Sequence, residues 1–509
     1  MRKKWFIGLC ATCLCLLGSG FFFGCQEEEQ PQVAPPEVKT YTVEVAFSIT
    51  DSCSTTGGDL TQEVSKNAPF TPIAITPKLG YKVTGYTVDG VTYPSDYIAM
   101  QEVEKSTTVT VNVDYATDEL PIINIHADGP IESKEEYVDM TFSMENCYTE
   151  IKEVTGGIRL RGNSTKTFPK KPYRIKFDKK QSLFGLEKAK SWVLLAEYLD
   201  PSAMRNFTAL TLGGQSDGLK FTCTPHKVNV YLNGEYIGLY TLCEQVQENE
   251  GRVDIETEIT SDMVEITDYN FLVCMDEKHL NDVGAEEDVT YVRIKEFNYV
   301  MELKYPEKDD FPSEAQFKDF IERLKVYIYD TLKLMNDGAE EQVRQKINIK
   351  SLIDFNIIDN IMMEYDHAIY SYNMYYTNTS DDPEENGKLN FGPIWDYDFC
   401  MNTDWTGKPN EQFEIRADQG ILYRNWFARA TKRDCFHTEV KERYNRIFKN
   451  YLAYLINHID NMYISMQESL KLNAEKWYGD YTYDITEKNC EFVINFLIAR
   501  KTYLDEQFA

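Results

Sequence analysis

Histidine is scarce in this chain, and its cysteines form no metal-binding pattern. Only 6 of the 509 residues are histidines, and none of the cysteines beyond residue 25 belongs to a CxxC motif or a tight Cys/His cluster. Structural and catalytic zinc sites draw their ligands from such clusters. A zinc site is therefore not expected. The wide spacing of the cysteines is also unlike a small disulfide framework, and one or two long-range disulfides stay open.

Positive charge is also in short supply. The chain has 53 Lys and Arg against 82 Asp and Glu, which gives a net charge of −29. A surface of that sign repels phosphate backbones, so no nucleic-acid partner is expected. The acidity suits cations such as Mg²⁺ or Ca²⁺, although solvation of an exported protein explains it equally well. With 42% hydrophobic residues the chain can bury a sizeable core.

A long hydrophobic run occurs once, at the start of the chain. Basic residues 2–4 precede the apolar run 5–23, and Cys25 follows it directly after a glycine. This order is typical of a bacterial lipoprotein signal peptide in which the cysteine receives the lipid. An uncleaved anchor is the alternative, because the run approaches the ~20 residues that span a bilayer. We predict a signal peptide over 1–24, a flexible tether over 25–39, lipidation at Cys25, and a cell-envelope protein facing outside the cytoplasm.

Residues 40–117 have the pattern of a small all-β module. Tyr41, Val43 and Val45 alternate with polar residues, as do the valines of the segment 109–113. Asp89-Gly90 separates two strand-like runs and predicts a hairpin turn. The module is similar to short β repeats on exported bacterial proteins, where such units act as spacers or adhesive modules, so no chemistry is assigned to it.

The remainder, residues 118–509, predicts an α+β domain. Strand and turn signals dominate 122–310, and helical periodicity dominates 312–500. Within the first part a helix is expected over 200–212, with Asp200 as its N-cap. The order indicates a β-rich lobe followed by a helical lobe, and ligand sites concentrate in clefts between such parts.

The strongest local motif is FGPIWDYDF, residues 391–399. If this segment is an extended strand, Asp396 and Asp398 point to one face and the aromatic residues between and beside them to the other. Two adjacent carboxylates repel each other unless a cation lies between them, so the pair suits Mg²⁺ held together with phosphate oxygens. A solvated strand face, or aspartates paired with arginine, is the alternative.

A second motif, MMEYDHAIYSYNMYY, covers residues 362–376. Asp366 follows the end of an expected helix, and Asn373 comes seven residues later. An aspartate that accepts a hydroxyl proton beside an asparagine that binds metal is the arrangement of a phosphotransfer loop. Capping of a turn and a backbone hydrogen bond explain the two residues equally well. His367 is interpreted as structural.

A third motif, RLRGNSTKTFPKKPYRIKF, covers residues 159–177. Arg161, Asn163 and Ser164 lie in a polar loop between two strands, where backbone N–H groups and basic side chains form a phosphate cradle. Arg174 and Lys176 share one face of the second strand, and Lys176 is the candidate for pairing with nucleotide phosphates. A charged hairpin is the alternative. The chain contains no GxxxxGK[ST] motif.

A fourth motif, VNVYLNGEYIGLYTLCEQV, covers residues 228–246. Asn233-Gly234 predicts a hairpin turn between two apolar strands. The second strand ends near Glu244, which is a candidate for the segment beside a bound base. A purely architectural hairpin is equally compatible with the pattern.

Five segments in chain order resemble the CotH kinase family over about residues 120–500: LRGNSTKTFPKKPYRIKF, LFGLEKAKSWVLLAEYLDPSAMRN, VNVYLNGEYIGLYTLCEQV, NMYY and FGPIWDYDF. The resemblance implies a two-lobed, atypical protein-kinase-like fold with a β-rich N-lobe and a helical C-lobe. It also implies use of ATP with Mg²⁺ or Mn²⁺. Asp396 and Asp398 would be metal ligands, Asn373 a second-metal ligand and Asp366 the catalytic aspartate. Arg161, Asn163, Ser164, Lys176 and Glu244 would lie on the nucleotide side.

The activity that follows from this resemblance is transfer of the ATP γ-phosphoryl group to Ser or Thr hydroxyls of exported or surface proteins. No evident glutamate partner for Lys176 accompanies it, because the helix expected over 200–212 offers Arg205 and Asn206 instead. Two further functions stay open. One is a non-catalytic surface adhesin or scaffold that keeps the fold. The other is a glycosyltransferase that binds a nucleotide sugar through the Asp-x-Asp motif.

Overall fold

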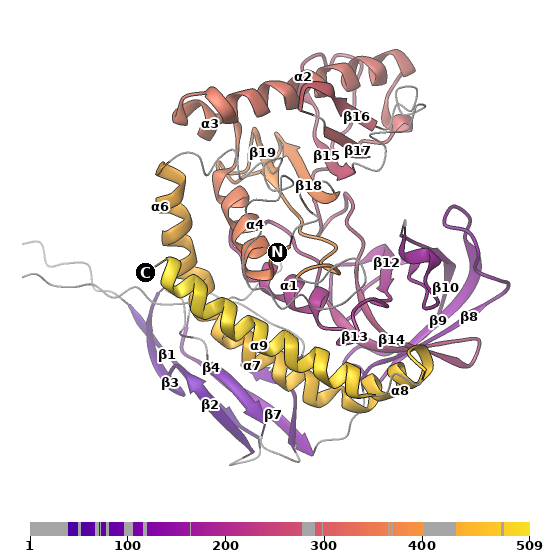
Figure 1. Ribbon diagram of the computed structural model, residues 1–509, viewed down its shortest axis with the longest axis vertical. Coiled ribbons are helices and arrows are strands. Elements are labelled where there is room, and N and C mark those ends of the chain that lie inside the picture. The colour runs from indigo at the N-terminus through magenta and orange to yellow at the C-terminus, as the bar shows by residue number, and fades with distance from the viewer. Residues whose placement is uncertain are drawn as a thin grey trace, which may run out of the picture. The chain divides into compact units, whose positions relative to one another are not determined.

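The structure is a computed structural model of the chain (Figure 1). It describes residues 39–48, 52–66, 71, 73–77, 81–95, 105–115, 120–162, 164–276, 291–297, 299–364, 367, 370–401, 434–479 and 483–508. The predicted signal peptide, the lipidation site Cys25, and the candidate residues Asn163 and Asp366 lie outside these ranges. The contacts divide the chain into two compact units, Met1–Thr117 and Asp118–Ala509.

The first unit is built from β-strands. One sheet has the order β3-β1-β7-β5-β6, and β2 pairs with β4. Its strands are β1 (Thr40–Phe47), β2 (Cys53–Gly57), β3 (Thr61–Ser65), β4 (Ile73–Pro77), β5 (Tyr81–Val88), β6 (Val91–Pro94) and β7 (Thr107–Tyr115). The alternating valines Val43, Val45 and Val111 are buried as predicted. Asp89 and Gly90 form the β5–β6 turn with φ of 50° and 82°, the left-handed conformation that such a hairpin requires.

The second unit begins with a closed barrel of order β10-β11-β12-β14-β13-β8-β9. Its strands are β8 (Ile122–Ala127), β9 (Val138–Glu145), β10 (Ile151–Leu160), β11 (Tyr173–Gln181), β12 (Ala189–Leu195), β13 (His226–Leu232) and β14 (Glu235–Glu244). Alternate residues of β11, such as Ile175 and Phe177, are buried in the barrel core, whereas Arg174 and Lys176 face outward together, as predicted. Asn233 and Gly234 form the predicted β13–β14 turn.

A second sheet of order β16-β17-β15-β18-β19 follows the barrel in the same unit. Its strands are β15 (Phe271–Asp276), β16 (Tyr291–Ile294), β17 (Tyr299–Tyr305), β18 (Tyr370–Thr377) and β19 (Lys388–Phe391). Figure 1 shows helix α2 (Glu314–Asp337) crossing this sheet. The residues that bury against it, Phe317, Phe320, Ile321 and Leu324, have the predicted helical spacing.

The rest of the second unit is helical, as the sequence indicates. The helices are α3 (Glu340–Lys346), α4 (Ile349–Met362), α6 (Asp434–Arg443), α7 (Lys449–Ser465), α8 (Gln467–Trp477) and α9 (Tyr483–Gln507), with a π-helical turn over Tyr444–Phe448. The sequence pattern also predicts one helix over about 437–470, whereas the observed helical run contains the π-helical turn and ends at Ser465, before the non-helical Met466. No described helix is both long enough and apolar enough to cross a membrane.

Helix α1 (Arg205–Gly213) begins five residues later than the predicted start at Asp200. The intervening Ala203 has φ of 52°, which an α-helix excludes. Asp200 nevertheless provides an acceptor for free N–H groups at the helix start. Its Oδ2 accepts hydrogen bonds of 2.9 Å from the N–H groups of both Met204 and Arg205. The N-cap of α1 is Met204, so the prediction of Asp200 as the N-cap is wrong, although its carboxylate accepts from the first N–H groups of the helix.

Candidate functional site

The two aspartates of the FGPIWDYDF motif lie in a turn and not on a strand. Strand β19 ends at Phe391, and Asp396 has φ of 69° in the left-handed region. An extended strand excludes that conformation, so the prediction that both carboxylates share one strand face is wrong. The residues around the aspartates are buried, including Trp395 and Tyr397. Asp396 itself is exposed, which places one carboxylate at the surface of a buried, aromatic turn.

Asp398 is held by the second residue of helix α1. The Asn206 Nδ2 donates to Asp398 Oδ1, and the Asn206 Oδ1 accepts from the backbone N–H of Tyr397 at 2.8 Å. Burial raises the pKa of Asp398 well above its ordinary value, and the neighbouring acids Asp396 and Glu197 raise it further. This carboxylate therefore lies in a site with an excess of negative charge.

Neither aspartate is neutralised by a basic side chain from the described part of the chain. The hydrogen bond that Asp396 accepts comes from the Ser371 hydroxyl, at 3.2 Å, and the one that Asp398 accepts comes from an amide. No lysine or arginine of the described ranges lies within 4 Å of either carboxylate. Within the described part of the chain, the alternative in which these aspartates pair with arginines therefore finds no support.

The predicted phosphate loop lies beside this turn. The Arg161 guanidinium is stacked over the Trp395 ring, with 5.3 Å from its carbon to the ring centroid. Gly162 follows with φ of 83°, and a Cβ there would lie only 2.0 Å from the Thr165 hydroxyl. Ser164 is exposed at the start of a short 3-10 turn, and its carbonyl accepts from the Thr167 hydroxyl. The fold thus brings Arg161 next to the acidic turn, and only glycine fits the tight part of the loop.

Further basic side chains adjoin Arg161 on the outer face of the barrel. Arg174 pairs across the ladder with Arg159, and its Nη2 contacts the Ser191 hydroxyl at 3.4 Å. Burial lowers the pKa of Arg174, and the like charges of Arg159 and Arg161 lower it further. The Nε groups of Arg159 and Arg174 are buried without a hydrogen-bond partner. An anion bound here would satisfy donors that the protein leaves open.

Lys176 lies on the same outward face of β11, but it is exposed. Its ammonium is 6.0 Å from the ring centroid of Tyr137. A different lysine is buried near the aspartates. Lys227 on β13 forms an ion pair with Glu197 at 2.7 Å, with both side chains about 1% exposed, and also donates to the Thr241 hydroxyl.

The Lys227–Glu197 pair is what sequence reasoning missed. The two residues are 30 positions apart, so no local spacing connects them. The available signal was Lys227 itself, a lone charge in the strand HKVNVYL, because a lysine in a buried strand needs a carboxylate partner. Burial raises the pKa of Glu197, while the adjacent Lys227 opposes that rise. The Glu197 Oε1 is buried without a hydrogen-bond partner.

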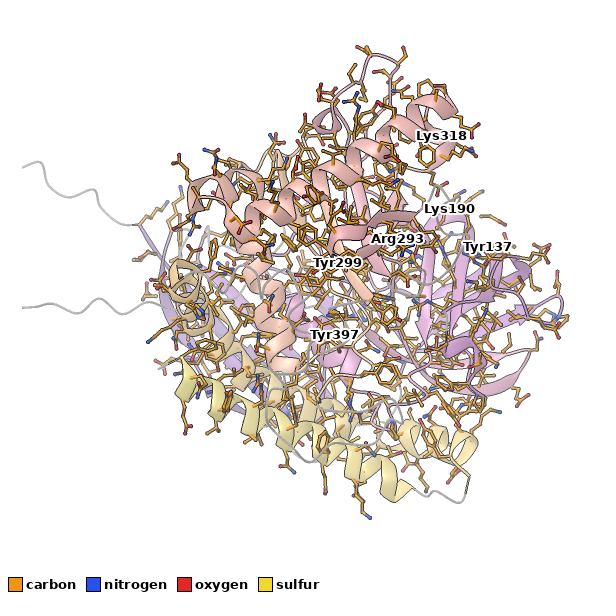
Figure 2. The ribbon with its side chains drawn as sticks, turned by 45° about the horizontal axis from the view of Figure 1, so that its top comes forward. Tyr137, Lys190, Arg293, Tyr299, Lys318 and Tyr397 are labelled. Carbon is orange, nitrogen blue, oxygen red and sulfur yellow. The ribbon has the colours of Figure 1, made fainter. Side chains whose placement is uncertain are left out.

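His367 fastens the acidic turn to helix α4. Its Nδ1 lies 2.9 Å from Asp359 Oδ1 and its Nε2 lies 2.6 Å from the carbonyl of Trp395. Both partners are acceptors, so both ring nitrogens carry protons. Burial opposes this charge, but Asp359 outweighs it and the pKa of His367 is raised to about 10. Tyr397, labelled in the interior of the unit in Figure 2, donates to the same Asp359 oxygen at 2.7 Å. His367 is thus structural, as interpreted from the sequence.

Asn373 lies in strand β18 and is 2% exposed. Its side-chain amide donates to the Pro393 carbonyl at 2.8 Å, and its backbone carbonyl accepts from the Gly392 N–H at 2.9 Å. These bonds fix the backbone that leads into Asp396. The metal-ligand role of Asn373 stays a prediction, and the contacts that the structure gives it are positioning ones.

Glu244 ends strand β14 and is buried. Its Oε2 accepts from the Thr224 N–H at 2.7 Å, and burial raises the pKa of its carboxyl group. A small hollow lies in the same unit. Its walls are Lys220, Phe221, Arg252, Val253, Asp254, Tyr375, Glu385, Phe391, Gly392 and Pro393. The hollow therefore adjoins the backbone that leads into the acidic turn.

The donor set fits a divalent cation only together with a ligand. Among the described residues, no group of three or more His, Cys, Asp or Glu side chains has the geometry to hold a metal ion by itself. Mg²⁺ is commonly held by one or two carboxylates plus substrate phosphates, because it keeps several waters. Asp396, Asp398 and the open Oε1 of Glu197 supply oxygens of that kind, and Asp398 carries the raised pKa that a nearby cation would lower.

The closed barrel, the second sheet and the acidic turn all belong to the unit Asp118–Ala509. A family model for CotH kinase protein matches residues 158–504, which is more than half of the chain. The chain therefore belongs to the CotH kinase family. A search of curated proteins finds no significant match. The family implies use of ATP, and the matched residues include both the basic loop and the acidic turn.

Proposed function

We propose that this chain is a metal-dependent atypical protein kinase that transfers the γ-phosphoryl group of ATP to Ser or Thr hydroxyls. The observation that carries the proposal is the contact of Arg161 with Trp395. It brings the basic loop to within one residue of Asp396. The neighbouring strand residues Arg159 and Arg174 have buried Nε groups without a hydrogen-bond partner. A polyphosphate with its metal matches both halves, since the anion meets the arginines and the cation meets the carboxylates.

The residues would divide the work as follows. Arg161 and Arg174 bind and orient phosphate oxygens from the barrel side. Asp396 and Asp398 hold the metal, with Asn206 fixing the rotamer of Asp398. When bound, Mg²⁺ or Mn²⁺ supplies neutralisation of the charge that develops on the transferred phosphoryl group. Asp366 accepts the proton of the attacking hydroxyl, the role that the family resemblance gives it.

The buried Lys227–Glu197 pair would act as a support for this site. The Lys227 ammonium lies in the same charge cluster as Asp398, because its ion-pair partner Glu197 raises the pKa of Asp398. A fixed positive charge there limits the accumulation of negative charge when Asp398 ionises. Lys176 remains the predicted nucleotide lysine, with its exposed ammonium free to meet a phosphate that Arg174 also contacts.

The substrates and the location follow from the N-terminal sequence. We propose that the chain is lipidated at Cys25, is anchored to a membrane of the cell envelope and faces outside the cytoplasm. Its substrates would then be exported or surface proteins. The hydrophobic run 5–23 followed by Gly-Cys supports this reading.

The test is label transfer by the purified second unit and full-length chain. Each is incubated with γ-labelled ATP or with labelled UDP-sugars, with and without Mg²⁺ or Mn²⁺, and with a generic protein acceptor. The proposal expects metal-dependent transfer from ATP that Asp396→Ala abolishes. Transfer from a UDP-sugar would instead establish the glycosyltransferase, and binding of neither nucleotide would leave a scaffold.

A further inference from the structure

Two cysteines lie together in the core of the second unit. Cys243 belongs to strand β14, and Cys223 lies in the segment between α1 and β13. They are 0% and 1% exposed, and both belong to the same hydrophobic cluster. The Cys223 thiol donates to the carbonyl of Glu244 at 3.4 Å, which is the residue next to Cys243. Both cysteines are thiols in this structure.

The backbone fixes this proximity. His226 pairs with Leu242 in the antiparallel β13–β14 ladder, so the residues that precede His226 run back alongside the end of β14. The Thr224 N–H donates to the Glu244 carboxylate at 2.7 Å, which holds the segment there. Cys223 therefore approaches β14 through its own side chain and through its neighbour's backbone.

The ionisation of the thiols is consistent with the same geometry. Burial raises the pKa of Cys223 well above its ordinary value, and a hydrogen bond with the Cys243 side chain is the next cause. The Cys223 sulfur thus lies against the residue that follows Cys243 in β14, and a disulfide further requires Cα atoms about 4.4–6.8 Å apart. The buried Cys490 differs, because its thiol meets the Ser202 carbonyl at 3.8 Å.

We propose that Cys223 and Cys243 form a disulfide when the chain matures in an oxidising compartment. The two thiols lose two electrons and two protons, and one S–S bond forms. The electrons reduce a disulfide-bearing oxidant to its dithiol through a mixed disulfide. Because both sulfurs are buried, the exchange takes place while the chain folds and before the core closes.

The bond would tie the segment before β13 to the end of β14. That segment carries Lys220 and Phe221, which line the hollow. A crosslink constrains the unfolded chain, and in the folded chain it holds this segment against the end of β14. The inference concerns the covalent state of the chain, and it stands or falls independently of the kinase activity.

The test compares full-length protein from two compartments. One sample is made in the reducing bacterial cytoplasm, and the other is exported to the periplasm through a leader of the host. Both are denatured in iodoacetamide and digested with trypsin without reductant. Cleavage after Lys220, Lys227 and Arg252 places the two cysteines on separate peptides, 221–227 and 228–252.

The proposal expects the two peptides to be joined in the exported sample, to separate on reduction, and to be alkylated in the cytoplasmic sample. In the exported wild type, reductant should also lower the midpoint of thermal unfolding. Cys223→Ser should remove both effects, and Cys490→Ser should remove neither. Alkylated Cys223 and Cys243 in the exported protein would overturn the proposal, as would linkage of either to a third cysteine. The wild-type peptide map decides even if a variant fails to fold.

Discussion

The Arg161 guanidinium lies over the Trp395 ring at 5.3 Å, and this contact joins two motifs that are more than 230 residues apart in the chain. Arg161 directly follows strand β10, the first strand of the phosphate-loop hairpin. Trp395 directly precedes Asp396. The contact therefore sets the separation between the basic and acidic halves of the site.

Replacing Arg161 by leucine should weaken nucleotide use without unfolding the protein. The change removes a partly desolvated cation–π contact, worth roughly 0.5–2 kcal/mol. It also removes a charged donor to phosphate. The KM for ATP should rise about 10- to 100-fold, where each factor of ten is about 1.4 kcal/mol. Steady-state kinetics and thermal unfolding measure the two effects. The exposed Lys179→Leu on β11 is the matched control, and an equal loss there would show a general charge effect.

The Lys227–Glu197 pair should be strongly coupled in a double-mutant cycle. Lys227→Met leaves Glu197 buried without its counter-charge, and such a change costs about 3–5 kcal/mol. Glu197→Leu likewise leaves Lys227 buried without its counter-charge. The double variant Lys227→Met/Glu197→Leu should lose less than the sum of the single changes. Chemical denaturation of the three variants measures this, and additive losses would show that the two residues do not interact.

His367 should make the protein less stable in alkaline solution. Its folded pKa is raised to about 10, against an ordinary value of 6.5, so its contribution is fully present below pH 6.5. That contribution is lost as the pH rises through the interval up to about 10. His367→Gln should lower the free energy of unfolding at pH 7. The difference in unfolding free energy between wild type and this variant should become smaller toward pH 10. Unfolding curves across this range give the difference, and a gap that is constant with pH would contradict the charged form.

His458 offers a matched comparison within the same fold. It is half-buried, and burial lowers its pKa to about 4, so it is neutral over the whole range. His458→Gln should therefore shift stability by the same amount at pH 7 and at pH 10. If His367→Gln and His458→Gln showed the same change of stability with pH, the pH dependence would come from elsewhere in the molecule.

Much of the fold could be predicted from the sequence because its signals are local. The Asn233-Gly234 turn lies between two alternating strands, and the apolar stripe of α2 repeats every three or four residues. The start of α1 was misplaced because the left-handed Ala203 separates Asp200 from the helix, whose N-cap is Met204. Only the three-dimensional path of the chain shows that an aspartate five residues away reaches those N–H groups.

The candidate site was less predictable because its contacts are non-local. The Asp-x-Asp spacing correctly marked a pair of acids, but the left-handed Asp396 excludes the strand that the spacing suggested. Asn206 reaches Asp398 across 192 residues, and no spacing rule connects them. The buried Lys227–Glu197 pair is hidden for the same reason. Residue type thus identified the acids, whereas their partners depend on tertiary packing.

Thermal unfolding with Mg²⁺-ATP tests the central claim most directly. A ligand at 100 times its Kd stabilises the folded state by about 2.7 kcal/mol, so the wild-type midpoint should rise clearly with Mg²⁺-ATP and little with ATP alone. Asp398→Asn keeps the oxygen that accepts from Asn206 and removes a carboxylate that its neighbours disfavour. Without ligand its midpoint should therefore match or exceed that of wild type. With Mg²⁺-ATP its rise should disappear. An undiminished rise in Asp398→Asn and Asp396→Asn would contradict the account.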